Sequence, residues 1–403
     1  MLAGKCRLGK LWDEFAAARR PACLAATESH FLSVTFVLPA IAPADFKRSK
    51  KFSNIENPFI DAPMPPASLA DLEERLSRPT PAVIEMMSQL PGDIIILGAA
   101  GKMGPSLARM AKRASDKAGT RRRVIAVSRF SSPGAAEEFQ QHGIEVIATD
   151  LLSANAVAYL PHAPNVIYMA GMKFGSTGQE SMTWAMNAWL PGLVCERYHR
   201  SRIAAFSTGN VYGLVPVERG GSHEEDALNP KGEYAMSCLG RERMFEHFSL
   251  TRGTPVSLIR LNYACDLRYG VMVDIARQVW NGEPVDVTMG YFNTIWQGDA
   301  NALSLLSLAK AHSPAWVVNL TGTATLSVRE VAHTFGKLFG KPVQITGQEA
   351  PDALLSNPYR SFVELGIPFI RDEELTEWVA QWISTGGESL GKPTHFESRD
   401  GKF

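Results

Sequence analysis

The chain has 403 residues, of which 45% are hydrophobic, and its 41 Lys and Arg residues balance its 41 Asp and Glu residues. This composition is typical of a globular protein with a sizeable core, and the balanced charge argues against nucleic acid as the main partner. No run reaches the roughly 18 apolar residues of a membrane span. The five cysteines are scattered without metal-ligand spacing, so we expect free thiols, no metal site and a reducing, cytoplasmic location.

Residues 1–66 are predicted to form a poorly ordered extension. A basic, alanine-rich start leads to the apolar stretch 31–42, which is similar to a signal peptide that ends in small residues. Acidic residues ahead of this stretch, and Pro- and Asn-rich sequence after it, argue against export. Upstream sequence added by an early start codon is the other interpretation.

Ordered structure is predicted to begin with a helical segment over residues 68–90. Ser68 and Asp71 outline a capping box, and leucines continue at helical spacing up to Leu76. Apolar residues from Val83 onward form a second short helical face. This segment therefore precedes the main domain as two short helices.

From Asp93 onward, short apolar strands alternate with helices. This pattern predicts an α/β fold, a Rossmann-type doubly wound parallel sheet that helices cover on both faces. Residues 67–262 are assigned to this dinucleotide-binding domain. The strand candidates are 94–97, 124–127, 146–148, 166–169, 203–206 and 256–259, and helices lie near 105–118, 134–142, 153–160, 179–199 and 234–251.

After Leu261 the alternation loosens, which predicts a smaller mixed lobe over residues 263–403 that binds the substrate. Beyond Gly386 the sequence is a polar, glycine-rich tail. The lobe is expected to contain a strand at 316–320 and helices near 272–281, 299–311, 327–339 and 372–384.

The most informative motif follows the first strand, where Gly98, Gly101 and Gly104 precede a helical pattern. A buried strand, a glycine turn and a helix N-terminus form a socket for a pyrophosphate, because glycines let the phosphate approach and the helix dipole favours an anion. Lys102 and Met103 lie in the same turn and are also candidates for cofactor contact. The alternative is a purely structural tight turn.

The residue that ends the second strand of such a fold usually contacts the adenosine ribose, and an acid there favours NAD. Here Ser128 and Arg129 end the strand, and an arginine fork beside a hydroxyl suits a 2′-phosphate. We therefore predict NADP, with NAD as the alternative; an exposed loop arginine is the competing interpretation. Asp150 and Leu151 follow the third strand, where an acid can accept from adenine or begin a helix.

Four later segments carry a family resemblance. With the glycine turn, they resemble the extended short-chain dehydrogenase/reductase family, also called the NAD-dependent epimerase/dehydratase family, over roughly residues 93–385. The resemblance is specific for the superfamily and much less so for a substrate. The segments are 166–173, 206–213, 230–242 and 319–330.

This resemblance implies a cofactor loop at Ala170, Gly171 and Lys173, and a catalytic pair at Thr208 and Tyr234. Tyrosine suits the role because it exchanges a proton with a substrate hydroxyl or carbonyl while hydride moves at the nicotinamide. Threonine would hold and orient the same substrate oxygen. The alternative is two ordinary residues at a strand end and a helix start.

The family expects a lysine four residues after the tyrosine, where it lowers the tyrosine pKa, but Cys238 stands there. An ordinary tyrosine has a pKa near 10, so losing the cation costs on the order of several kcal/mol of barrier unless another group substitutes. Lys173, Arg241 and an oxidised nicotinamide are candidate substitutes, although Arg241 and Arg243 are expected to be surface charges. Cys238 is expected to be a small filler, with a reactive thiol as the alternative.

Other positions also depart from the family pattern. Gly209 and Asn210 replace the acids that follow the threonine in the dehydratase branch, which argues against sugar 4,6-dehydration. The substrate pocket is therefore not simply that of a known sugar-nucleotide enzyme. Candidate pocket residues, each equally suited to lobe packing, are Asn262, Arg268, Tyr269 and Trp296.

Two functional hypotheses follow. The first is an NAD(P)-dependent oxidoreductase or epimerase that acts on a hydroxyl of a small sugar-like substrate, either free or nucleotide-linked. The second is a catalytically degenerate NAD(P)-binding sensor or scaffold, which the missing lysine supports. The resemblance also implies a homodimer that pairs through the helices near 179–199 and 234–251.

Overall fold

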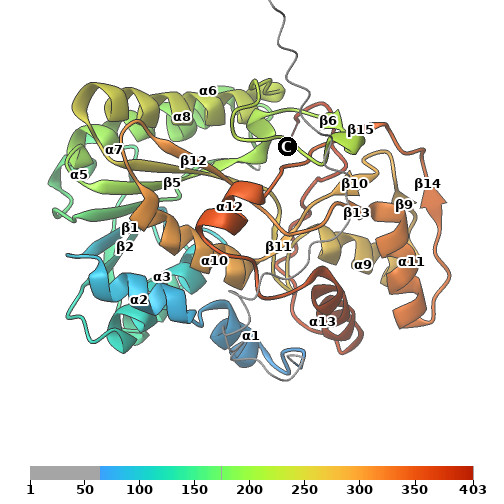
Figure 1. Ribbon diagram of the computed structural model, residues 1–403. Coiled ribbons are helices and arrows are strands. Elements are labelled where there is room, and N and C mark those ends of the chain that lie inside the picture. The colour runs from blue at the N-terminus through green and yellow to red at the C-terminus, as the bar shows by residue number, and fades with distance from the viewer. Residues whose placement is uncertain (1–63, 174, 403) are drawn as a thin grey trace, which may run out of the picture. The chain divides into compact units, whose positions relative to one another are not determined.

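A seven-stranded parallel sheet in the order β12-β7-β5-β4-β1-β2-β3 organises the chain (Figure 1). The computed structural model describes residues 64–173 and 175–402, so the prediction for the N-terminal extension lies almost wholly outside the described residues. The fold class predicted from the sequence is confirmed. The strands are β1 (Ile94–Leu97), β2 (Val124–Ser128), β3 (Glu145–Ala148), β4 (Asn165–Tyr168), β5 (Arg202–Thr208), β7 (Val256–Leu261) and β12 (Trp316–Leu320).

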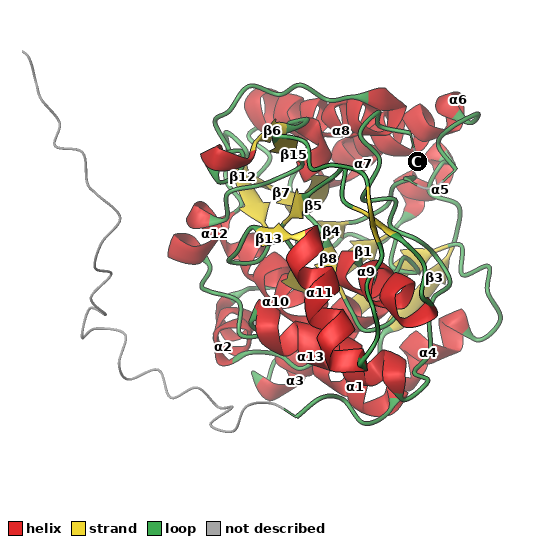
Figure 2. Cartoon of the chain, turned by 90° about the vertical axis from the view of Figure 1, so that its right-hand side faces the viewer, coloured by secondary structure: helices red, strands yellow, loops and turns green. Residues whose placement is uncertain are grey.

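The strands are continuously apolar because both faces of the sheet are covered (Figure 2). In β1, Ile94 and Ile96 join the core on one face, while Ile95 and Leu97 join the core on the other. On the first face pack α2 (Pro81–Gln89), α3 (Gly104–Lys117) and α10 (Gln297–Leu306), and on the second pack α5 (Ala154–Tyr159), α7 (Leu190–Tyr198) and α8 (Gly232–Arg252).

A separate apolar core lies among the later elements, around α9 (Val271–Asn281), α11 (Val328–Phe339) and α13 (Asp372–Ser384). α4 (Ala135–Gln141) follows β2, and the 3-10 turns are Gly209–Val211, Val217–Arg219 and Ser307–Lys310. Short strands and one further helix complete the fold: β6 (Val215–Pro216), β8 (Ala264–Cys265), β9 (Val285–Asp286), β10 (Tyr291–Phe292), β11 (Ile295–Trp296), β13 (Leu326–Ser327), β14 (Ile345–Thr346), β15 (Asp352–Ala353) and α12 (Tyr359–Glu364).

Two elements predicted in the smaller lobe belong to the main sheet layer instead. β12 pairs with β7 at the edge of the sheet, from Trp316 beside Ser257 to Leu320 beside Leu261. α10 packs on the sheet face through Leu303 and Leu305. The sequence pattern predicted both elements, but local periodicity does not reveal which core an amphipathic element joins.

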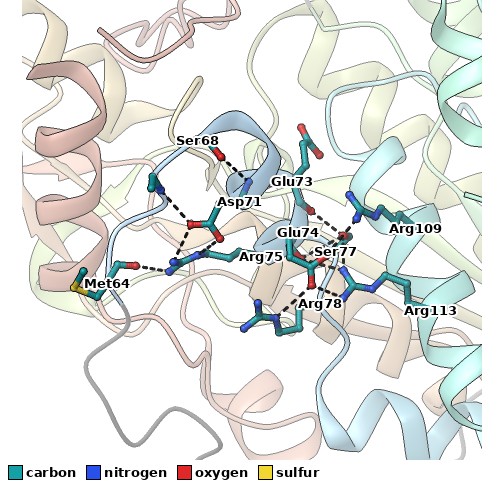
Figure 3. Close-up of polar contacts among 11 residues, drawn as sticks. Met64, Ser68, Asp71, Glu73, Glu74, Arg75, Ser77, Arg78, Arg109 and Arg113 are labelled. Carbon is teal, nitrogen blue, oxygen red and sulfur yellow. Dashed lines mark hydrogen bonds and ion pairs between the residues drawn. The ribbon is translucent and has the colours of Figure 1, made fainter. Parts of the chain in front are cut away.

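The first described helix, α1 (Leu69–Leu76), begins at the predicted cap, where the Ser68 side chain accepts a hydrogen bond from the Asp71 amide. Its Glu74 carboxylate pairs with two arginines of α3, at 3.2 Å from Arg109 and 2.5 Å from Arg113 (Figure 3). These contacts tie α1 to the helix that follows the glycine turn.

The helix predicted near 179–199 is divided into α6 (Glu180–Trp184), a π-helical turn η2 (Ala185–Trp189) and α7. Pro191 lies in the first turn of α7. Proline lacks an amide hydrogen, so the regular α-helical bonding cannot continue through it, and a wider turn precedes it. Among the described helices, none is both long and apolar enough to cross a membrane.

A buried ion pair fixes α8 to the sheet. The Arg260 guanidinium on β7 donates to the Glu242 carboxylate on α8 at 2.8 Å, and both side chains are almost wholly buried. The Ser207 hydroxyl on β5 donates to the same carboxylate at 2.5 Å. Because the pair is fully hydrogen-bonded, it sets the position of α8 over β5 and β7.

Replacing Glu242 with alanine is expected to lower the free energy of unfolding by about 3–5 kcal/mol, because the Arg260 charge would remain buried without its partner. Urea denaturation measures the loss. The matched control is Glu246→Ala on the same helix, which removes the exposed partner of Arg243 and is expected to cost about 0–1 kcal/mol. Equal losses for the two variants would contradict this interpretation of the buried pair.

Candidate functional site

The glycine turn lies at the carboxyl end of β1, beside the carboxyl end of β4. Gly98 has φ +88°, and a Cβ there would lie 2.5 Å from the Ala170 amide nitrogen. A Cβ on Gly104 would collide with the Ala99 carbonyl oxygen. These two glycines are therefore required by the packing of the turn itself.

Gly101 differs from the other two glycines of the turn. Its φ is not positive, and a Cβ there would meet nothing closer than the Gly98 carbonyl oxygen at 3.5 Å. Protein packing therefore does not demand glycine at this position. Met103, the N-cap residue of α3, supplies no side-chain cap to the helix N-terminus that follows. Open space above Gly101 and a helix N-terminus fit a pyrophosphate.

Two lysines lie at this edge of the sheet. The Lys102 ammonium lies 3.0 Å from the centroid of the Tyr269 ring, and burial, with the positive charges of Lys173 and Lys392, lowers the pKa of Lys102 to about 7. Burial also lowers the pKa of Lys173 to about 8. Such clustering of like charges suits an anionic ligand, which would relieve the repulsion.

The predicted catalytic pair meets across the gap between β5 and α8. Thr208 is the last residue of β5 and Tyr234 lies in the first turn of α8, and their side chains are hydrogen-bonded. The Thr208 Oγ1 atom accepts from the Asn210 amide at 3.2 Å and from the Asn210 Nδ2 at 2.9 Å. These bonds orient the threonine hydroxyl so that it can donate toward the tyrosine oxygen.

Cys238 occupies the position one helical turn beyond Tyr234, and the two side chains are also hydrogen-bonded. Burial, followed by Cys238, raises the pKa of Tyr234 well above its usual range, while Arg241 and the Thr208 bond act in the opposite direction. Burial raises the pKa of the Cys238 thiol as well. The structure therefore gives no sign of an activated thiolate at Cys238, and a cation is still required to ionise the tyrosine.

Arg241 was predicted to be a surface charge, and this prediction is wrong. It is buried, donating to the Phe206 carbonyl oxygen at 2.9 Å and to the Asn187 Oδ1 at 2.6 Å. It lies seven residues after Tyr234, so two helical turns return it to the same buried face of α8. Arg243 faces outward and pairs with Glu246, as predicted.

Asn187 is a site residue that the sequence analysis missed. From the π-helical turn, its side chain accepts from the Met172 amide at 2.9 Å and donates to the Met172 carbonyl oxygen at 2.8 Å. Its Nδ2 also donates to the Ser237 hydroxyl of α8 at 3.0 Å. It thus ties the loop Ala170–Lys173 to α8. The interrupted helical pattern before Pro191 is the only sequence signal that marks this position.

The loop after β4 passes close to Arg241. A Cβ on Gly171 would collide with the Arg241 guanidinium, and Ala170 lies against Gly98. From the end of this loop, the Lys173 ammonium lies 5.9 Å from the centroid of the Tyr234 ring. The structure therefore brings the predicted cofactor loop and the predicted catalytic tyrosine together.

At the other end of the sheet edge, Ser128 closes β2 and Arg129 is exposed just beyond it. The Asp150 carboxylate accepts from the Leu152 amide at 3.0 Å, so it caps a local turn. Leu151 is buried in the core. Of the four predicted adenosine-side residues, Ser128 and Arg129 therefore lie at the carboxyl end of β2, where they were predicted.

The four candidate pocket residues separate into two groups. Tyr269 lies against Lys102, at the glycine turn. Asn262, Arg268 and Trp296 serve the packing of the lobe: Trp296 lies edge-on to Trp378 at 5.3 Å, and Arg268 pairs with Asp266 and Glu73. Within residues 64–173 and 175–402, no cluster of His, Cys, Asp and Glu side chains could hold a metal ion.

Comparison with solved structures shows the same fold in sugar-nucleotide enzymes. The dTDP-glucose 4,6-dehydratase from Bacillus anthracis str. Ames, in complex with NAD, has a TM-score of 0.62 and 15% sequence identity, over 73% of this chain and 97% of that one. The UDP-glucuronic acid 4-epimerase from Bacillus cereus, in complex with UDP-glucuronic acid and NAD, has a TM-score of 0.61 and 16% identity, over 73% and 99%.

A search of curated protein sequences found no match to this chain. The sequence model of the NAD dependent epimerase/dehydratase family, however, matches residues 94–265. That segment contains the glycine turn, the loop after β4, Thr208 and Tyr234. Residues 94–265 of this chain are therefore similar to the NAD dependent epimerase/dehydratase family.

Proposed function

We propose that this chain binds a nicotinamide dinucleotide, NADP in preference to NAD, and catalyses oxidoreduction or epimerisation at a hydroxyl of a sugar-like, nucleotide-linked substrate. The observation that carries the proposal is the hydrogen-bonded pair Thr208–Tyr234, which lies at the same sheet edge as the glycine turn. Substrates of parallel α/β sheets bind at this carboxyl edge.

In this proposal each side chain has a distinct task. Tyr234 exchanges the proton of the substrate hydroxyl, and Thr208 holds the same oxygen while Asn210 orients the threonine. Gly98, Gly101, Lys102, Met103 and Gly104 cradle the pyrophosphate. When bound, the nicotinamide supplies the hydride donor or acceptor.

Lys173 replaces the cation that the family places four residues after the tyrosine. Its ammonium lies on the Tyr234 side of the cofactor loop, 5.9 Å from the ring centroid, whereas Cys238 is neutral and buried. Arg241 is buried on the same helix, where it donates hydrogen bonds to the Phe206 carbonyl oxygen and to the Asn187 side chain. Positive charge from both sides favours the ionised tyrosine.

The choice of NADP rests on Ser128 and Arg129 at the end of β2, where no acidic residue stands to bind the ribose hydroxyls. The two solved structures compared above contain NAD. A third structure of this fold, the UDP-glucose 4-epimerase from Thermotoga maritima, holds UDP-glucose at a TM-score of 0.60 and 16% identity. These ligands support a nucleotide sugar as the first substrate class to test.

A second candidate function is supported by the raised pKa of Tyr234 beside Cys238. A tyrosine that stays protonated would leave a protein that binds the dinucleotide without turnover, a sensor or scaffold.

We also propose that a second copy of this chain pairs with α6, η2 and α8, because apolar side chains are exposed there. They are Met182, Trp184, Trp189 and Met236.

The first prediction separates the two candidate functions. With NADPH or NADP and a panel of nucleotide sugars, the wild type is expected to exchange hydride, and Tyr234→Phe to reduce the rate by about 10²–10⁴-fold because it loses the proton-transfer group. Absorbance of the reduced nicotinamide measures the exchange. Tight dinucleotide binding without turnover on any substrate would favour the sensor. Cys238→Lys then shows whether a restored cation raises activity.

The second prediction compares two glycines of one turn. Gly101→Ala is expected to keep the wild-type melting temperature but to weaken dinucleotide binding, because its methyl group would fill the space proposed for the pyrophosphate. Gly104→Ala is expected to lower the melting temperature, because its methyl group meets the Ala99 carbonyl. Calorimetric titration with NADP, combined with thermal melting, measures both effects. Unchanged affinity in a folded Gly101→Ala variant would exclude this site.

The third prediction concerns pH. The Lys173 ammonium, with a pKa of about 8, is charged below that pH and neutral above it. Affinity for the anionic dinucleotide is therefore expected to fall as the pH rises through about 8. Lys173→Arg keeps its charge and is expected to flatten this part of the profile. NADPH fluorescence titrations over a range of pH on either side of about 8 measure the affinity. The same pH dependence in the wild type and in Lys173→Arg would contradict a role for Lys173.

A further inference from the structure

The C-terminal segment, residues 386–402, contacts several residues of the proposed dinucleotide site. After α13 it is first held by the Arg268 carbonyl oxygen, which accepts from the Leu390 amide at 3.2 Å. The Asp274 carboxylate on α9 then accepts from the Thr394 amide at 2.8 Å and from the Thr394 hydroxyl at 2.6 Å. In Figures 1 and 2 the C-terminus lies among the elements near α6.

The segment contacts the groups assigned to the ligand. Lys392 lies close enough to Lys102 of the glycine turn to act on its charge. The Thr394 carbonyl oxygen accepts from the Lys173 ammonium at 3.4 Å. The chain therefore runs from the pyrophosphate end of the proposed site toward the nicotinamide end.

The last residues of the segment reach the start of the helix that carries Tyr234. Gly401 has φ +76°, and a Cβ there would collide with the Lys231 carbonyl oxygen. A Cβ on Gly232 would in turn collide with the Gly401 carbonyl oxygen. The two backbones approach so closely that both positions require glycine.

The segment is anchored in the second lobe at two points. Phe396 is buried in the core of that lobe, 6.3 Å from the Phe292 ring. The Arg399 guanidinium pairs with the Asp352 carboxylate of β15. These anchors explain why a polar, glycine-rich sequence, expected to be a simple tail, follows a defined path.

The segment can nevertheless leave the proposed site without breaking an element of the fold. From Thr385 to Lys402, all described, it forms no helix and no strand, so no sheet ladder would be lost on release. Release would cost the burial of Phe396 and the Arg399–Asp352 ion pair, but no regular secondary structure.

We propose that residues 386–402 form an autoinhibitory strap that covers the proposed dinucleotide site and must move aside before the cofactor enters. The Thr394 carbonyl oxygen of the strap accepts a hydrogen bond from Lys173, so the strap competes with the ligand for this cation. This inference rests on the proposed function, because it concerns access to the proposed cofactor site.

A thiol-labelling experiment tests the strap without any cofactor. Lys173→Cys is made in the full chain, in a chain that stops after Glu388, and together with Arg399→Ala, which releases one anchor. The matched control for the anchor is Arg329→Ala, which removes an arginine–glutamate pair with Glu349 on the same lobe that includes no residue of the strap. Labelling of the parent chain without Lys173→Cys is subtracted as background.

The thiol at position 173 is expected to react about tenfold faster when the strap is removed or released, as follows if it is closed for nine-tenths of the time. The Arg329→Ala control is expected to leave the rate unchanged. Equal rates in the full chain, the shortened chain and the Arg399→Ala variant would overturn the strap. If the shortened chain does not fold, the Arg399→Ala comparison alone decides.

NADPH titration of the same series without Lys173→Cys completes the test. Tighter binding to the shortened or Arg399→Ala chains, by about the same tenfold factor, supports a strap that limits entry. Unchanged or weaker binding overturns it. If no protein of the series binds NADPH or NADH, the proposed function has failed, whereas the labelling rates still report whether the segment covers position 173.

Discussion

The arrangement of the site depends on how α8 is held against the sheet. Glu242 and Arg260 exclude water and satisfy each other, with Ser207 supplying a further hydrogen bond. The residue that precedes Glu242, Arg241, donates a hydrogen bond to the Phe206 carbonyl oxygen on β5. These buried polar contacts fix α8 in one position over β5. A shift of α8 along its axis would leave a charged group buried without its partner. The meeting of Thr208 and Tyr234 follows from that position.

The charge that the family concentrates in one lysine is distributed differently in this chain. A small, neutral cysteine, Cys238, occupies the lysine position. Burial, followed by Cys238, raises the pKa of Tyr234. The Arg241 guanidinium acts to lower the pKa of Tyr234, and the Lys173 ammonium lies 5.9 Å from the centroid of the Tyr234 ring. Asn187 links the two, because it binds both the Arg241 guanidinium and the backbone beside Lys173. The π-helical turn that presents Asn187 is therefore part of the electrostatic design.

Much of the sheet domain was predictable because its signals are local. Continuous apolar strands, glycines at a strand–helix junction and a tyrosine at a helix start each occupy a few adjacent residues. The side of the fold that an element joins is not local information, so β12 and α10 were assigned to the wrong layer. The burial of Arg241 was missed for the same reason, since an arginine on a helix gives no sign of which neighbours cover it. Asn187 became recognisable only when the loop and the helix were seen together.

The tail illustrates a further limit of sequence patterns. Polar and glycine-rich composition predicts a segment that builds no core of its own, and residues 386–402 indeed form no helix or strand. Such a segment can still pack against other elements. Here Phe396 is buried in a core that other elements form. Lys102 and Lys173 lie at the carboxyl edge of the sheet, and the Thr394 carbonyl oxygen accepts a hydrogen bond from Lys173, as a phosphate oxygen can. The strap proposed for residues 386–402 rests on this shared use of Lys173.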